Sequence, residues 1–192
     1  SVGDNPDQSS TQGSPFVDEV TSRVENLLAA EDVEQTLQLV NSLTTTVNSA
    51  TLVDADEREH VRELLLNTTA LLYDTVNLTS EAIEQGAATV ASLIGVRPVD
   101  LTPRAVDAAI ASAEMLATAG ETMSVSTDSL AAAASYLFVA IDSQTGIDQH
   151  HAAQRGEQME SVMESVATIT VLQMVDGEQP AEITTQAFEL TV

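Results

Sequence analysis

Apolar residues recur three and four positions apart along most of this chain, which is the period of an amphipathic α-helix. The pattern begins at residue 16, breaks several times, and continues to about residue 172. It predicts six or seven helices, which the breaks place at residues 16–28, 32–47, 54–76, 80–95, 102–120, 130–141 and 154–172. We therefore expect an all-α fold, a helical bundle.

Several of these segments carry residues typical of helix ends. Pro15 and Pro103 suit the first position of a helix, and Thr102 is a good N-cap for the segment after it. Gly95 and Gly120 mark the ends of two other segments. These signals support the predicted boundaries independently of the apolar period.

Two segments predict details of the core. The segment at 130–141 is apolar on nearly all sides, so we expect it to lie at the centre of the bundle. The segment that opens at Asp54 is expected to turn one apolar stripe inward, made of Val61, Leu64, Leu65, Leu71, Leu72 and Val76.

The two ends of the chain differ from its middle. Residues 1–15 are rich in Gly, Ser, Asp and Pro and predict a flexible linker before the bundle domain at 16–175. In the tail, 176–192, a turn signal precedes an alternation of apolar and polar residues that predicts one β-strand. A lone strand is not stable. We expect its partner to come from the rest of a longer chain or from another copy.

Charge narrows the range of partners. The chain has 192 residues with 30 Asp and Glu against six Arg and no Lys, which gives a formal net charge of −24. Such a surface repels nucleic acid and anionic lipid. Because 43% of the residues are hydrophobic, the chain is not a disordered acidic tail. No stretch is apolar for long enough to span a membrane.

Few residues offer catalytic chemistry. The chain has no cysteine, and its three histidines are His60, His150 and His151; adjacent histidines on a helix diverge too far to chelate one metal. The acidic cluster at Asp54–Glu59 lacks the order of a calcium loop and predicts a solvated helix N-terminus. We expect no enzyme activity, no metal site and no cofactor. The crowded carboxylates leave weak calcium binding open as an alternative.

Two sequons mark candidate glycosylation sites. Asn67-Thr68-Thr69 and Asn77-Leu78-Thr79 both fit the N-x-[ST] acceptor pattern. Asn77 lies in a predicted connection between helices, which is the more accessible of the two positions.

Three stretches carry a family resemblance. The first is VNLTSEAIEQGAATVASLIGVRPVDLTPRAVDAAIASAEMLA, the second is SLAAAASYLFVAI, and the third is the tail MVDGEQPAEITTQAFELTV. The first stretch contains a P-x-x-L-[ST]-P link from Pro98 to Pro103. The first two resemble the region of polycystin-type receptors where the receptor-for-egg-jelly (REJ) module passes into the helical subdomain A of a GAIN domain. The tail is similar to the segment by which such receptors enter the β-rich subdomain B.

The resemblance implies a non-catalytic, extracellular structural or interaction domain of a polycystin-like membrane protein at the cell surface. The surface of a cilium or flagellum is one such location. It implies protein partners, such as a polycystin-type channel or another extracellular component, and roles in adhesion, channel association or force transmission. The cleavage site of GAIN domains lies in subdomain B, so the resemblance assigns it to no residue here. The alternative is a soluble, acidic helical bundle of a halophile, in which carboxylates keep the surface hydrated in concentrated salt.

Overall fold

The computed structural model describes residues 15–30, 32–49, 54–75, 78–174, 181–185 and 187–191. These residues form seven α-helices, one 3₁₀ turn and two short strands. The helices are α1 (Pro15–Ala29), α2 (Val33–Asn48), α3 (Ala55–Thr75), α4 (Ser80–Gly95), α5 (Pro103–Gly120), α6 (Asp128–Ser143) and α7 (Gln149–Gln173), with the 3₁₀ turn η1 (Pro98–Asp100) between α4 and α5. The strands are β1 (Glu182–Thr184) and β2 (Glu189–Thr191). The predicted all-α bundle with a C-terminal strand is confirmed.

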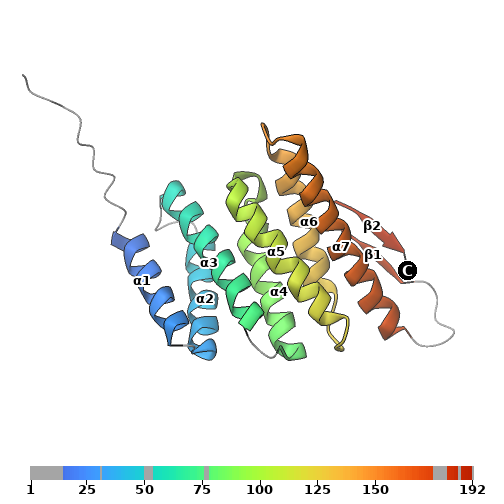
Figure 1. Ribbon diagram of the computed structural model, residues 1–192, viewed down its shortest axis with the longest axis horizontal. Helices are drawn as coiled ribbons and strands as arrows, with labels where there is room; N and C mark the ends of the chain where they lie inside the picture. Colours follow the sequence, from blue (N-terminus) through green and yellow to red (C-terminus); the bar gives the residue numbers. More distant parts are fainter. Residues whose placement is uncertain are drawn as a thin grey trace, which may run out of the picture.

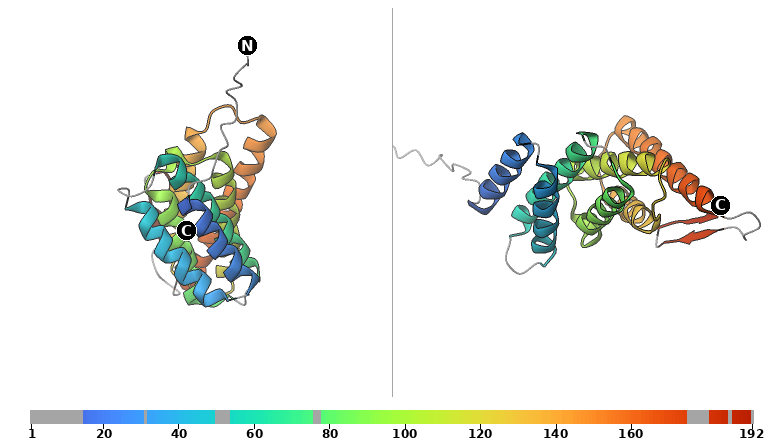
Figure 2. Two further views of the ribbon diagram at one scale, coloured as in Figure 1. Left: turned by 90° about the vertical axis from the view of Figure 1, so that its left-hand side faces the viewer. Right: turned by 90° about the horizontal axis from the view of Figure 1, so that it is seen from below.

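The helices stack in a row rather than around one axis. Each helix packs against its neighbour in sequence and against the next but one, most extensively α3 on α5, α4 on α6 and α5 on α7. The odd-numbered helices therefore form one layer and the even-numbered helices the other. In Figure 1 the row runs along the long axis from α1 to α7 and the strands, and Figure 2 gives the end-on view.

Helix α5 lies inside this row, in contact with α3, α4, α6 and α7. Its buried face is made largely of alanine, and a small side chain lets the neighbouring backbones approach closely. Ser112 is fully buried on this face, and its hydroxyl lies 3.3 Å from the carbonyl of Leu66 on α3. The prediction that residues 130–141 occupy the centre is wrong, because α6 lies near one end of the row, with α4, α5 and α7 as its helical neighbours.

Buried threonines are compatible with these helices because their hydroxyls bond within the helix. Thr44, Thr68, Thr69 and Thr170 are buried, and each donates to the carbonyl four residues earlier at 2.8 Å. A hydroxyl that bonds to its own helix leaves no polar group unsatisfied in the core.

The tail is not a lone strand. Its second half pairs with its first half as an antiparallel hairpin, with Ile183 opposite Leu190. Both side chains pack against the helical core, and the ring of Phe188 meets that of Phe138 on α6 edge to face at 5.8 Å. The expectation that a longer chain or another copy must supply the partner strand is therefore wrong.

Other boundaries differ in detail. Helix α7 begins at Gln149 rather than at residue 154, because the Asp148 side chain accepts a hydrogen bond from the His151 amide and caps the helix there. Leu71 is 57% exposed and not part of the inward stripe, whereas the unpredicted Leu66 is fully buried. The linker before residue 15, Val76 and the turn at 176–180 lie outside the described residues.

Within the described helices, none combines the length and the apolar character needed to cross a membrane.

Glycine allows a close contact between α3 and α4. The ring of Tyr73 lies flat on Gly86, where an added Cβ atom would come within 2.7 Å of the ring carbons. Tyr73 is only 4% exposed, so its ring has little room to move away. Gly156 on α7 differs, since a Cβ there would have no neighbour within 4 Å.

We predict that Gly86→Ala lowers the free energy of unfolding by about 1–3 kcal/mol, because the added methyl overpacks the α3–α4 contact. The measurement is urea unfolding followed by circular dichroism. The matched control, Gly156→Ala, should raise the free energy of unfolding by up to about 1 kcal/mol through helix propensity alone. Equal effects of the two substitutions would contradict the assigned contact.

Candidate functional site

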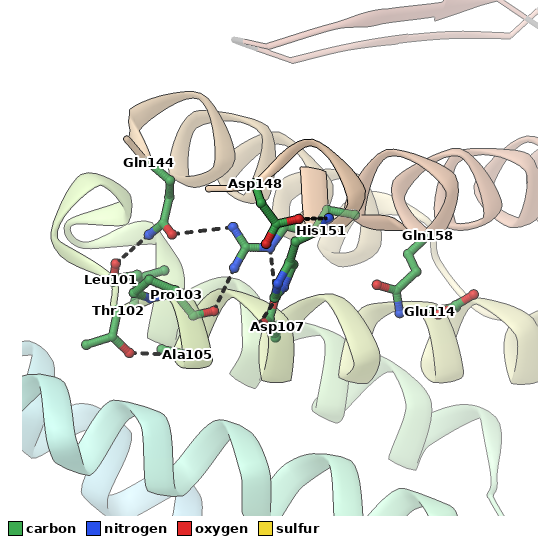
Figure 3. A network of polar contacts seen from close by, with 11 residues as sticks. Leu101, Thr102, Pro103, Ala105, Asp107, Glu114, Gln144, Asp148, His151 and Gln158 are labelled. Atoms are coloured by element: carbon green, nitrogen blue, oxygen red, sulfur yellow. Dashed lines mark hydrogen bonds and ion pairs between the residues drawn. The ribbon is translucent and has the colours of Figure 1, made fainter. Parts of the chain in front are cut away.

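The most extensive polar network in the described chain surrounds Arg155, near the start of α7. Its side chain is 1% exposed, and a buried guanidinium needs partners for its charge and its donors. Nε donates to Asp107 on α5 at 2.7 Å, and Nη2 donates to the carbonyl of Pro103 at 2.8 Å. Nη1 donates to Gln144 at 3.4 Å. Figure 3 shows that Asp107 and Pro103 lie on α5 and that Gln144 approaches from the segment after α6.

Gln144 and His151 extend this network. The Gln144 amide donates to the carbonyl of Leu101 at 2.8 Å, which ties the end of α6 to the start of α5. The ring Nε2 of His151 lies 3.2 Å from both carboxylate oxygens of Asp107. Asp107 thus receives contacts from two residues of α7 at once (Figure 3).

The contacts between α5 and α7 continue down both helices at seven-residue intervals. Asp107 meets His151, Glu114 meets Gln158, and Glu121 meets Ser165, with a sequence separation of 44 in each pair. A constant separation means that the two helices run parallel and in register. Seven residues make two helical turns, so each set lies on one face of its helix. We call these three pairs the α5–α7 ladder.

A histidine beside an aspartate is also found in catalytic sites, where it activates a nucleophile. In the described structure the hydrogen bonds of the His151 ring go to Asp107 alone, and no hydroxyl or other nucleophile completes the arrangement. The Arg155 guanidinium binds the same carboxylate and two groups of the surrounding chain. These contacts join α7 to α5 and to the segment after α6.

A second buried ionic pair lies on α3. Arg62 is fully buried and donates from Nη1 to Glu59 at 2.9 Å. Burial lowers the pKa of Arg62 and raises the pKa of Glu59, and the attraction between the two groups offsets this only in part. Within the described residues, Nε and Nη2 of Arg62 and one oxygen of Glu59 are buried without a hydrogen bond. This pair is therefore less well satisfied than that of Arg155.

Tyr73 is also buried, and its hydroxyl has no hydrogen-bond partner in the described part of the chain. Burial raises the pKa of Tyr73 to about 12. The unfolded chain releases this proton near pH 10. As pH rises from about 10 towards 12, the unfolded state gains ionised tyrosine before the folded state does, so Tyr73 lowers stability in that window.

The residues singled out in the sequence lie apart from one another. His60 and His150 are exposed, as are Asp54 and Asp56 at the start of α3. Asn67 is exposed on the middle of α3, while Asn77 lies outside the described residues. The hydroxyl residue of the sequon, Thr69, is 1% exposed and donates to the Leu65 carbonyl, so a glycan at Asn67 must be attached before α3 folds.

The described residues contain no group of three His, Asp or Glu side chains placed to hold a metal ion. A groove of about 380 Å³ lies between α6 and β1. A smaller groove of about 230 Å³ between α2 and α4 is lined only by neutral side chains, most of them hydroxyl or amide.

Sequence reasoning missed the residues that matter most here. The sequence patterns did not identify Arg62 or Arg155 as core residues, yet both are buried. The available signal was the seven-residue spacing of acidic residues Asp107, Glu114 and Glu121, repeated 44 positions later by polar residues.

No protein-family model, curated protein or solved structure matches this chain.

We predict that Asp107→Ala lowers the free energy of unfolding by about 2–4 kcal/mol, because it leaves the buried charge of Arg155 without its carboxylate. Chemical denaturation at neutral pH measures the change. Replacing both partners, as Asp107→Ala with Arg155→Met, should cost less than the single Asp107→Ala, since no unpaired charge remains.

The matched control is Asp100→Ala, which breaks the exposed contact between Asp100 and Arg97 at 3.6 Å. We expect this change to cost less than about 1 kcal/mol. Strictly additive losses in the Asp107 and Arg155 double variant would show that the two side chains are not coupled.

Proposed function

We propose that this chain is a non-catalytic structural and interaction domain in the extracellular region of a polycystin-like membrane protein. The observation that carries the proposal is the stack itself. Its extensive helix contacts are all between neighbours or next neighbours in sequence, and α1 and the hairpin lie at opposite ends of the long axis (Figure 1). A pulling force applied to the two ends of the described chain would pass through the helices of the stack.

The use of buried charge supports a structural role. Arg155 binds a carboxylate of α5, a backbone carbonyl of α5 and the segment after α6, so one side chain fastens three parts of the stack. The α5–α7 ladder adds polar contacts along most of the shared length of the two helices. Such contacts fix the register of parallel helices, which a domain that holds or transmits force requires.

The location and the partners rest on the resemblance to the REJ and GAIN region of polycystin-type receptors. The exposed Asn67 sequon supports a passage through the secretory pathway. The proposed partners are a polycystin-type channel or another extracellular protein, in adhesion, channel association or force transmission at the surface of the cell, its cilium or its flagellum. An acidic surface favours basic regions of such a partner.

The charge also supports the alternative, a soluble bundle from a halophile. The net charge is −24, and the described chain shows ion pairs for only a few of its carboxylates, at Glu59, Asp100 and Asp107. Self-repulsion of this size destabilises a compact state unless salt screens it. The two functions therefore differ in the salt concentration at which the domain folds.

We predict that the purified domain keeps its helical circular dichroism and a cooperative melting transition at 0.15 M NaCl, as expected of an extracellular protein. Raising NaCl to 3 M should increase the melting temperature only modestly. A domain that is unfolded at about 0.15 M and folds only in molar salt would favour the halophile and overturn the proposal. Potassium sulfate at equal ionic strength controls for specific chloride effects.

We also predict that an antibody raised against residues 15–174 labels intact cells of the source organism without permeabilisation. Prior digestion of the cell surface with proteinase K should remove the label. Labelling that needs permeabilisation would contradict the extracellular location, and an antibody to a cytosolic protein controls for leakage.

A further inference from the structure

The groove between α6 and β1 has the form of a peptide-binding site. One wall is the outward face of α6, where Ala131, Ala132 and Ser135 form a floor of small side chains beside Tyr136. The other wall is β1, represented by Ile183, Thr184 and Thr185, and no residue of β2 lines the groove. Figure 2 shows the hairpin beside the C-terminal helices, at the end of the stack.

The edge of β1 beside this groove is unpaired, because the described sheet has only the order β1–β2. The amide of Thr185 donates to the carbonyl of Phe188 at 2.9 Å, so these two residues face each other as a hydrogen-bonded pair. Hydrogen-bonded and non-hydrogen-bonded pairs alternate along an antiparallel ladder. Ile183 and Leu190 are therefore bonded to each other, and the backbone groups of Glu182 and Thr184 point away from β2.

A buried side chain in the groove also lacks a partner. Ser135 is 4% exposed and lines the groove, and its hydroxyl forms no hydrogen bond with the described residues. Most other buried hydroxyls of this chain bond to the carbonyl four residues earlier, so Ser135 is an exception. The Ser135 hydroxyl is therefore open to the groove, where a ligand group can form a hydrogen bond with it.

The charge around the groove indicates which charge a ligand should carry. Asp128 lines the groove at the start of α6, and Glu182 stands at the start of β1. No Arg is among the lining residues, and the whole chain carries a net charge of −24. A second copy of this chain would bring the same negative charge to the groove. A positively charged segment is complementary to it.

We propose that this groove binds an extended, basic peptide segment of a partner protein, which adds to β1 as a third strand. The outward amides and carbonyls of Glu182 and Thr184 bond to the peptide backbone, as in other cases of strand addition. Side chains of the added strand alternate between its two faces. Small side chains on the inner face pack over Ala132 and reach the Ser135 hydroxyl, while Lys or Arg near the peptide ends meets Asp128 and Glu182.

This site is independent of the function proposed above, which concerns the stack and its location. Loss of peptide binding would leave the salt dependence and the surface labelling unchanged, so the two can fail separately.

The test is fluorescence anisotropy with a fluorescein-labelled peptide, Lys-Thr-Val-Thr-Val-Lys, added to the full 192-residue chain at 0.15 M NaCl. Two control probes separate the contributions of charge and backbone. One replaces both Lys with Glu, and the other keeps both Lys but carries N-methyl groups on alternate amides, which blocks strand pairing. We expect each control probe to bind at least 10-fold more weakly than the basic probe.

Three variants test the location. Thr184→Pro removes an outward amide of β1 and should weaken binding of the basic probe at least 10-fold. Thr191→Pro is the matched control, because Thr191 lies opposite Glu182 and its amide points to the outer edge of β2. It should leave binding unchanged. Ser135→Ala removes the unpaired hydroxyl with little risk to the fold and should weaken binding about 3- to 10-fold, the value of one hydrogen bond.

Equal binding of the basic and N-methylated probes, or equal losses in Thr184→Pro and Thr191→Pro, would show general attraction to an acidic surface and overturn the proposal. If Thr184→Pro unfolds the hairpin, Ser135→Ala decides the matter, and unchanged binding by that variant rejects the site. Sedimentation that shows a dimer abolished by Thr184→Pro would assign the groove to a second copy and reject the peptide.

Discussion

The close approach of helices that are two apart in the sequence is the constraint on which this structure depends. It requires small side chains on the faces that meet, and α5 supplies them as a face made largely of alanine. Each alanine buries only a small apolar area, so many residues must be buried to stabilise such a contact. The row arrangement achieves this by giving α5 four helical neighbours. Glycine has the same role at Gly86 and Gly95, which each accept the ring of a tyrosine.

Alanine faces pack closely but specify register weakly, because one alanine resembles the next. Polar contacts add the missing specificity. Each pair of the α5–α7 ladder joins residues 44 positions apart, and Arg155 also binds Asp107 of the first pair. Comparable separations, 46 and 48, join Leu66 to Ser112 and Asn41 to Thr89. A shift of one helical turn would break every one of these pairs, so we regard them as the elements that select one alignment of the helices.

The extent to which the structure was predictable follows from the range of each interaction. Helix existence is a local property, and the apolar period, with end signals such as the Thr102 cap, located the helices well. The start of α7 was missed because its first turns are polar and only the Asp148 cap marks it. The pairing of helices depends on residues more than 40 positions apart, and no local pattern identifies Asp107 as the partner of Arg155. The position of α6 was predicted wrongly for a related reason. Helix α6 is more hydrophobic than α5, yet fewer helices pack around it.

The hairpin shows how one end of a stacked fold can differ from the rest. Helices inside the row are covered on both sides, but α6 and α7 have no further helix pair beside them in the described chain. The hairpin covers part of this end through Ile183, Phe188 and Leu190. It is too small to cover all of it, because β1 and β2 span three residues each. The uncovered part is the groove beside β1, where an unpaired strand edge, the Ser135 hydroxyl and small side chains meet. The end of the stack is therefore the place where this domain has both the exposed backbone and the free surface that binding a partner requires.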